Sequence, residues 1–282
     1  MKIAIDSYSY HRYFGEIYPG LEQDPGSRMT MHDFLLRAHA LGVAGVSLES
    51  CFFPNPTAEA VTQLRNQLDA LGLERVWAWG HPAGLRSGDA PHEVADLKRH
   101  TEIAAAIGAK VMRICCGGRR TRPANWATHK AKLLPLLQDA VAHARAHEVV
   151  LAIENHIDFL ADELVELVET IASPWLGVCL DTANNLRLLE DPAVAIEKLA
   201  PYTRATHVKD ITAQRGNPRE FAFWPSVPVG QGLIDMPRAF EALRKQGYTG
   251  LLALEIDYLH PAYPNDEQAV VDSLNYMRGL LG

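Results

Sequence analysis

The sequence has fewer positively charged residues than negatively charged ones. Lys and Arg number 27 against 34 Asp and Glu, which gives a formal net charge of −7 at pH 7. Nucleic acids and anionic membranes are bound through basic surfaces, so this balance argues against both as partners. A small solute is the expected partner.

Long apolar runs are also missing. No window reaches the roughly 18 uninterrupted apolar residues of a spanning helix. The first residues, MKIAIDSYSYH, lack the apolar run of a signal peptide. We therefore expect a cytoplasmic protein without a membrane partner.

Cysteine is scarce, and its placement excludes two kinds of site. Cys51, Cys115, Cys116 and Cys179 fit neither a disulfide framework nor paired zinc knuckles. The last three lie in apolar runs, where buried reduced thiols are the usual case.

What the sequence does contain is a regular alternation of short β-branched runs and longer helical patterns. Strands are expected at residues 2–6, 45–49, 75–80, 110–115, 149–155, 176–181, 203–209 and 250–256. Helices are expected at residues 31–41, 57–71, 91–107, 127–147, 162–171, 192–199, 236–246 and 267–281. Eight such units without a linker predict an α/β fold, a single (β/α)8 TIM barrel that forms one domain over residues 1–282.

An open, doubly wound sheet is the alternative fold. It would normally carry a glycine-rich phosphate turn after its first strand. That position reads SYSYHRYF, which has no glycine. The barrel is therefore favoured.

Four polar residues end apolar runs that read as buried strands: Glu154, Asp181, His207 and Glu255. A charged group in such a place is costly unless something pairs with it, and barrel active sites form at the carboxyl ends of strands. A shared divalent metal is the simplest partner. Three carboxylates and one imidazole favour Mn²⁺, with Mg²⁺ and Co²⁺ as alternatives, over a closed zinc site.

A metal held in this way predicts proton transfer next to a carbonyl. The metal would polarise the carbonyl and stabilise an enediolate, while Glu154 and Glu255 act as catalytic acid and base on opposite faces of the reacting carbon. Taken singly, each residue also has a structural interpretation. These are a salt bridge from Glu154 to Lys209, a helix cap by Asp181, an ion pair of Glu255 and a core position for His207.

The segments AIENH, CLDTAN and THVKD, with the run PVGQGLIDMPRAFEALRKQGYTGLLALEID, resemble the sugar phosphate isomerase/epimerase superfamily of xylose isomerase-like TIM barrels. The resemblance covers the whole chain and is strongest over residues 149–257. It implies relatives among ketose 3-epimerases, hydroxypyruvate isomerases and inosose dehydratases. It also implies that the four strand-end residues hold Mn²⁺, Mg²⁺ or Co²⁺ and that the two glutamates are the acid and base.

One position departs from the family pattern. Many members have a histidine three residues after the metal aspartate, where this chain has Asn184. An amide can hydrogen-bond a hydroxyl group but cannot carry a proton at neutral pH. The departure leaves the substrate open beyond simple ketoses.

Several further residues at strand ends and in loops are predicted to contact substrate, each with structural pairing or packing as the alternative. Strand alternation places His156 on the face of Glu154, and Lys209 on the face of His207. The predicted contacts are Glu49, His81, His156, Asn184, Lys209, Arg215 and Trp224.

Two connections, residues 7–28 and 211–233, are long enough to be binding loops or lids, and both lie on the expected active-site side. A third loop, CGGRRTRPA, carries Arg119, Arg120 and Arg122. These arginines either bind a phosphate or carboxylate or form a solvated basic loop.

The predicted function is a metal-dependent isomerase or epimerase of a sugar or keto-polyol. A lyase or dehydratase of a keto-inositol or 3-keto sugar would use the same first step, with His81, His156 or Lys209 protonating the leaving group. A non-catalytic sugar-binding barrel is a third interpretation. DNA repair is disfavoured by the acidic balance and by Asn184. A homo-oligomer is compatible with the resemblance.

Overall fold

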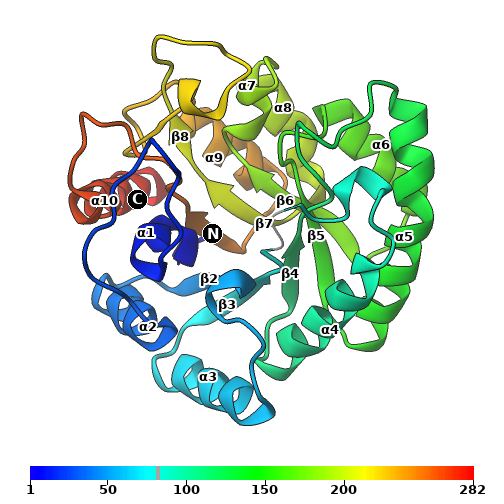
Figure 1. The fold of residues 1–282 in the computed structure, drawn as a ribbon, viewed down its shortest axis with the longest axis horizontal. Coiled ribbons are helices and arrows are strands. Elements are labelled where there is room, and N and C mark those ends of the chain that lie inside the picture. The colour runs from blue at the N-terminus through cyan, green and yellow to red at the C-terminus, as the bar shows by residue number, and fades with distance from the viewer. Residues whose placement is uncertain (81–82) are drawn as a thin grey trace.

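Eight parallel strands close into a barrel in the computed structural model, which describes residues 1–80 and 83–282 (Figure 1). Around the barrel the strand order is β1-β10-β7-β6-β5-β4-β3-β2. The strands are β1 Lys2–Asp6, β2 Gly45–Glu49, β3 Glu74–Ala78, β4 Val111–Ile114, β5 Val150–Glu154, β6 Leu176–Asp181, β7 Thr203–Val208 and β10 Leu251–Leu254. The predicted TIM barrel is confirmed.

Helices surround the strands, as Figure 1 shows. Those that cover the barrel are α2 Met31–Ala40, α3 Ala58–Ala70, α4 Glu93–Ala106, α5 Trp126–Ala146, α6 Ala161–Ile171, α8 Pro192–Leu199, α9 Met236–Lys245 and α10 Asp266–Leu281. A large apolar core lies between these helices and the outer faces of the strands. No helix in the described part of the chain has the length and apolar character needed to cross a membrane.

The helix starts and stops follow from local residue chemistry. Thr30 accepts a hydrogen bond from Asp33 N–H in a capping box at the start of α2, and Thr57 caps α3 through Ala60 N–H. Gly42 and Gly72 follow these two helices with φ of 67° and 65°, a left-handed conformation that glycine adopts without steric cost.

The long connections contain short elements that the hydrophobic pattern did not predict. Residues 7–28 include a 3-10 helix and α1 His11–Phe14. In the other connection, β8 Asp210–Ile211 and β9 Ser226–Val227 form a two-stranded antiparallel sheet. Elements of two to four residues are too short to show a periodicity.

Small residues fill the inside of the barrel. The interior cluster is formed by Ala4, Val76, Ala152, Cys179, Ala205, Leu251 and Ala253. Side chains two positions apart on a strand share a face, so the residue that follows each of these by two also points inward. The barrel therefore has a floor of small side chains with polar strand-end residues above it.

The cysteines agree with the expectation of reduced thiols. All four are free, and Cys115, Cys116 and Cys179 are buried. Cys51 is exposed.

Candidate active site

The four predicted metal ligands lie together at the carboxyl ends of their strands. Glu154 ends β5, Asp181 ends β6, His207 lies in β7, and Glu255 directly follows β10. Each comes two residues after a member of the small interior cluster, so all four point into the barrel. One possible ligand atom from each side chain lies within 4.8 Å of the other three, and all four residues are buried.

The two nitrogens of His207 face different carboxylates. Nδ1 lies 3.4 Å from Glu154 Oε1 and 3.2 Å from Glu255 Oε2, while Nε2 lies 3.5 Å from Asp6 Oδ2. A histidine that binds a metal through one nitrogen usually directs the other at a carboxylate or carbonyl, which sets the tautomer. Asp6 is placed to do this, with Nδ1 left to face the ligand set.

Arg113, from β4, holds Glu154 in place. Its Nε donates to Glu154 Oε2 over 2.6 Å, and its Nη1 lies 3.5 Å from Glu49 Oε2. The pairing therefore engages Oε2 of Glu154 and leaves Oε1 facing His207. The salt bridge to Lys209 that was considered for Glu154 is made to Arg113 instead.

The backbone that directly follows Asp181 holds its carboxylate in place. Its Oδ1 accepts hydrogen bonds from the N–H groups of Ala183 and Asn184 at 2.7 and 2.9 Å. The Asn155 side chain accepts from Asp181 N–H and donates to Asp181 O, both at 2.7 Å. The other carboxylate oxygen, Oδ2, is buried and has no hydrogen-bond partner within the described residues.

Lys209 provides the second cation of the site. Its Nζ lies 2.8 Å from Glu255 Oε2 and 3.2 Å from both Asp181 Oδ2 and Asp257 Oδ2. Asp257 is shared with the buried Arg187 at 2.8 Å. The neighbouring Asp210 points away from the site and accepts hydrogen bonds from the loop backbone.

The buried charges determine which groups are ionised. Burial opposes the ionised form of Glu154, but Arg113 and then His207 outweigh it and hold its pKa below the usual range. Glu255 behaves in the same way, because His207 and Lys209 lower its pKa against the effect of burial. Both glutamates are therefore carboxylates at neutral pH, as a metal ligand and a general base must be.

Glu49 differs from these two glutamates. Burial raises its pKa to about 8, even though Arg113 acts in the opposite direction. Burial alone would lower the pKa of His207, but Cys179, Glu255 and Glu154 raise it well above its ordinary value. His207 is therefore protonated beside these groups, and a metal bound through one of its nitrogens would displace a proton.

A divalent metal fits the donor set on the observations of this structure. Asp181 Oδ2, Glu255 Oε2 and His207 Nδ1 are buried polar atoms without a hydrogen-bond partner among the described residues. Their described contacts are the ion pairs with Lys209 and between His207 and the glutamates, which leave their hydrogen-bonding capacity available to a metal. Three carboxylates and an imidazole are donors that Mn²⁺, Mg²⁺, Co²⁺ and Zn²⁺ all accept.

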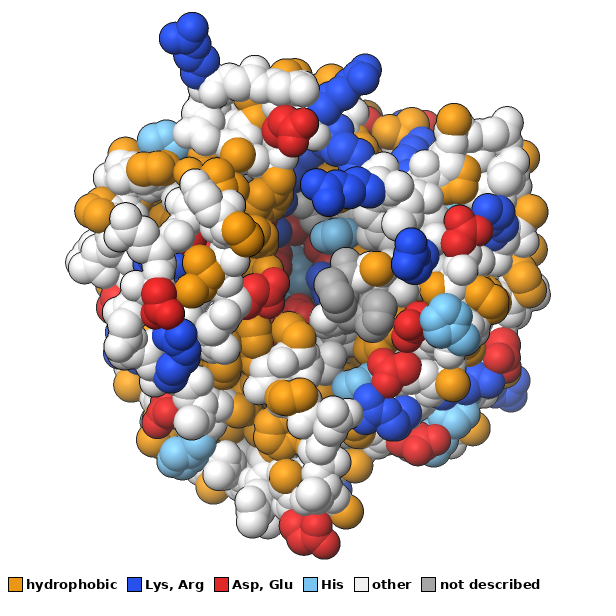
Figure 2. Space-filling view, viewed as in Figure 1, with side chains coloured by type: hydrophobic (Ala, Val, Ile, Leu, Met, Phe, Trp, Pro, Cys, Tyr) orange, Lys and Arg blue, Asp and Glu red, His pale blue; other side chains and the backbone are white. Residues whose placement is uncertain are grey.

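A cavity of about 1190 Å³ opens over the site, and Glu154 and Glu255 are the members of the set of four that line it. Figure 2 shows it as a central hollow, with red and pale blue side chains at its bottom and blue ones along one side. The long loops contribute Tyr8 and Tyr18 from one segment and Phe221 and Trp224 from the other. The prediction that both loops lie on the active-site side is confirmed.

Four of the predicted substrate-contact residues line this cavity: Glu49, His156, Lys209 and Trp224. Their contact with substrate stays a prediction. His156 Nδ1 lies 2.8 Å from Gly117 O and 3.4 Å from Cys115 Sγ. Because a carbonyl only accepts, Nδ1 carries a proton that it donates to Gly117 O.

The other three predicted contacts have different positions. Asn184 is buried and does not line the cavity; its amide donates to Glu154 Oε1 over 3.1 Å and accepts from Arg187. Arg215 is exposed outside the cavity wall, to which Arg219 of the same loop belongs. His81 lies outside the described residues.

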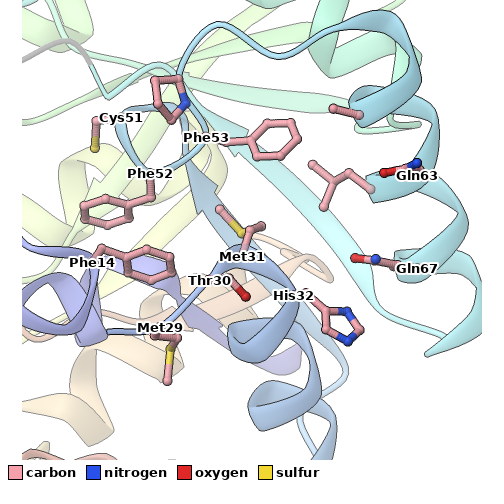
Figure 3. Close-up of a pocket in the computed structure, with 13 residues that line it drawn as sticks. Phe14, Met29, Thr30, Met31, His32, Cys51, Phe52, Phe53, Gln63 and Gln67 are labelled. Carbon is pink, nitrogen blue, oxygen red and sulfur yellow. The ribbon is translucent and has the colours of Figure 1, made fainter. Parts of the chain in front are cut away.

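A second hollow, of about 510 Å³, lies between α2, α3 and the start of the chain (Figure 3). Phe14, Met29, Met31 and Phe52 are among the side chains around it. None of the described residues that line it is Asp, Glu, Lys or Arg. His32 and Cys51 are the ionisable side chains among the described residues that line it. The barrel mouth gathers four possible metal ligands and is therefore the candidate active site.

Sequence reasoning missed Arg113, Asp6, Arg187 and Asp257. Two of them had a signal in the sequence. Arg113 interrupts the apolar run VMRICC, and Asp6 ends the run KIAID as Glu154 ends its own. A buried charge needs a partner, so both positions pointed to the site.

Comparison with known proteins places this architecture in a family. The family model described as "Xylose isomerase-like TIM barrel" matches residues 35–280. A 3-oxo-isoapionate decarboxylase of Pectobacterium atrosepticum is 26% identical over 151 residues, which cover 52% of each chain. An L-ribulose-5-phosphate 3-epimerase, UlaE, of Escherichia coli is 23% identical over 163 residues, 57% of this chain and 54% of that protein.

The chain spans about half the length of these curated relatives. Among solved structures, the IOLI protein with a bound zinc atom superposes with a TM-score of 0.76 at 14% identity, covering 99% of this chain and 98% of that one. That likeness supports the fold. The named sequence relatives are sugar-processing enzymes, which supports the prediction that this chain is an enzyme. By its barrel, its strand-end residues and the extent of the family match, the chain belongs to the xylose isomerase-like TIM barrel family.

Proposed function

We propose that the chain is a divalent-metal-dependent isomerase or epimerase of a keto-sugar or keto-polyol. The observation that carries the proposal is the meeting of Glu154, Asp181, His207 and Glu255 within 4.8 Å, with both glutamates in the wall of an open cavity. A bound Mn²⁺, or Mg²⁺ or Co²⁺ in its place, would polarise the substrate carbonyl and make the adjacent C–H more acidic.

Glu154 and Glu255 move the proton in this proposal. The barrel order places β7 and β6 between β10 and β5, so the two glutamates flank the site from opposite sides. One carboxylate removes the proton next to the carbonyl and the substrate becomes an enediolate. The other glutamate takes a proton from water in the open cavity and delivers it to the opposite face, which inverts that carbon, and the first glutamate releases its proton to water.

The surrounding residues keep the two bases in position. Arg113 engages one oxygen of Glu154, and Lys209 lies against Glu255. Both contacts keep the glutamates ionised before substrate binds. Phe221 and Trp224 from the loop form an apolar wall that limits the access of water to the reacting carbon.

Elimination of water is the second candidate reaction, and one observation favours it. His156 lines the cavity with its Nδ1 hydrogen directed at Gly117 O. Burial lowers the pKa of His156, but Cys115 and Glu154 outweigh it and raise the pKa to about 10, so Nε2 also carries a proton that it can donate. A third acid near the two glutamates could protonate a leaving hydroxyl group. The decarboxylase named among the relatives also begins from a keto compound.

The test is deuterium uptake in D₂O, followed by NMR over a panel of keto-sugars and keto-inositols with added Mn²⁺. Glu154→Gln and Glu255→Gln should each reduce uptake at least 100-fold, because an amide cannot accept the proton. Glu241→Gln, at an exposed position of α9, is the matched control. Metal content and melting temperature are measured in parallel so that loss of structure is recognised.

Normal exchange in either active-site variant would remove that glutamate from the acid and base pair. The products separate the two candidate reactions. An epimer or isomer supports the first candidate, and an unsaturated product supports elimination.

A further inference from the structure

The wall of the cavity carries arginines without carboxylate partners. Arg86, Arg119, Arg120 and Arg219 all line it, and none forms an ion pair with a described residue. They come from three connections that meet at the mouth, those after β3, β4 and β8. Figure 2 shows blue side chains gathered along one side of the hollow.

The cations nearer the barrel floor are different, because each is paired. Arg113 is held by Glu154 and Glu49. Lys209 is shared by three carboxylates, and Arg187 is bound to Asp257. Positive charge without a partner is therefore concentrated at the rim, while the floor carries the carboxylates.

Two acidic residues also line the rim and offset part of this charge. Glu16 accepts a hydrogen bond from Tyr8 Oη at 2.8 Å. Burial and the positive charges of Arg187 and Arg219 lower the pKa of Arg119. The negative charge of Glu220 raises this pKa but does not outweigh them. The positive potential around Arg119 thus exceeds what Glu220 neutralises.

Arg119 is also held in place. Its Nη2 donates to the main-chain carbonyl of Arg187, and the Arg187 guanidinium lies 5.0 Å from the centre of the Phe221 ring. An arginine fixed through one nitrogen keeps other N–H groups free in a planar arrangement that suits the oxygens of a carboxylate or phosphate.

We propose that the substrate carries an anionic group, a phosphate or a carboxylate, that binds Arg119 and Arg219 while its carbonyl end lies at Glu154 and Glu255. This inference rests on the function proposed for the residues at the barrel floor. Arg86 and Arg120 add positive charge to the same side of the mouth. The cavity of about 1190 Å³ exceeds the ~300–1,000 Å³ of ordinary ligand pockets, which leaves room for a charged extension beyond the reacting carbons.

The test is equilibrium binding to the Mn²⁺-loaded protein by calorimetry, with three probes of one carbon skeleton: ribitol, ribitol 5-phosphate and ribonate. None has a ketone, so binding is measured without turnover. Loss of a charge-assisted arginine contact corresponds to roughly 10- to 100-fold in affinity. At least one anionic probe should bind about 10-fold or more tightly than ribitol, and the one that does identifies the group as phosphate or carboxylate.

The Arg119→Ala/Arg219→Ala double variant should lose this preference and keep its affinity for ribitol. Arg219→Ala alone changes only an exposed loop residue and should lose part of the preference for the anionic probe. Arg145→Ala, an exposed arginine of α5 outside the cavity wall, is the matched control. Higher ionic strength should lower the affinity for the anionic probe and leave the affinity for ribitol unchanged, because salt screens exposed charge.

Three results would overturn the inference. These are equal binding of charged and neutral probes, failure of both anionic probes to bind, and an unchanged preference in the double variant. The deuterium exchange of neutral keto-sugars is measured separately, so the proposed function can survive when this inference fails.

Discussion

At the scale of single residues, the site consists of charged groups whose directions are set by their neighbours. Asp6 faces one nitrogen of His207, Arg113 holds one oxygen of Glu154, and backbone N–H groups hold one oxygen of Asp181. Each contact leaves the opposite atom of the same side chain facing the centre. Side chains positioned in this way need little rearrangement to bind a metal.

Asp6 provides the sharpest residue-scale prediction. Asp6→Asn keeps an acceptor for Tyr8 N–H but removes the negative charge that faces His207 Nε2. Metal affinity should fall about 10- to 100-fold, as expected for loss of an outer partner of a ligating histidine. His207→Ala should lose the metal altogether. Competition with a fluorescent chelator, with elemental analysis, measures both variants.

Asp33→Asn, at the exposed start of α2, is the control for these measurements. An unchanged affinity in Asp6→Asn would show that Asp6 does not orient the histidine. Full metal occupancy in His207→Ala would contradict the ligand assignment.

At the scale of elements, the connection between β7 and α9 is built around one buried carboxylate. Asp210 Oδ2 accepts from the N–H groups of Gly230 and Gly232, and Oδ1 accepts from Ile211 and Ile234. A Cβ at position 232 would lie 2.1 Å from Asp210 Oδ1, so only glycine allows this close approach. The carboxylate ties the far end of the loop to β8.

Asp210→Ala should therefore destabilise the loop more than its surroundings. Leaving several backbone N–H groups without an acceptor should cost roughly 2–4 kcal/mol of unfolding free energy. Urea denaturation measures this loss, and limited proteolysis should show faster cleavage within residues 211–233. Asp162→Ala, at an exposed position of α6, should change neither. Equal protease resistance in the two variants would argue against the anchoring role.

At the scale of the whole molecule, stability against acid is expected to depend on a histidine outside the active site. His129 of α5 is buried and stacks on Phe159 at 5.1 Å between ring centres. Burial, followed by the charges of Arg122 and Lys132, lowers its pKa to about 4. The folded protein therefore resists protonation of this ring.

The sign of the effect follows from proton linkage. Between the unfolded pKa of about 6.5 and the folded pKa of about 4, the unfolded chain binds a proton that the folded chain does not. Unfolding free energy should then fall by up to about 1.4 kcal/mol for each pH unit as the pH decreases through this range. His129→Phe should lack this contribution, which the difference between the two pH profiles measures by urea denaturation. Parallel profiles would contradict the assignment.

Much of the molecule could be predicted from its sequence. The alternation of strand and helix patterns predicted the closed barrel, and all eight barrel strands lie within two residues of the expected bounds. The four strand-end residues were predicted from the sequence to share one site, and they lie together in the structure. Both results have the same cause, because the hydrophobic period and the residue that ends each strand are local properties that the barrel repeats eight times.

What the tertiary structure alone decided is which charges meet. No pattern in the sequence pairs Arg113 with Glu154 or directs Asp6 at His207. Nor does one show that Arg219, which has no ion-pair partner among the described residues, lines the cavity while Arg215 does not. Such contacts join residues far apart in the chain, and their energies depend on burial and distance. The sequence by itself determined the barrel and the residue types at its mouth. The closure of that barrel determined how those charges are paired and which arginines remain available for a ligand.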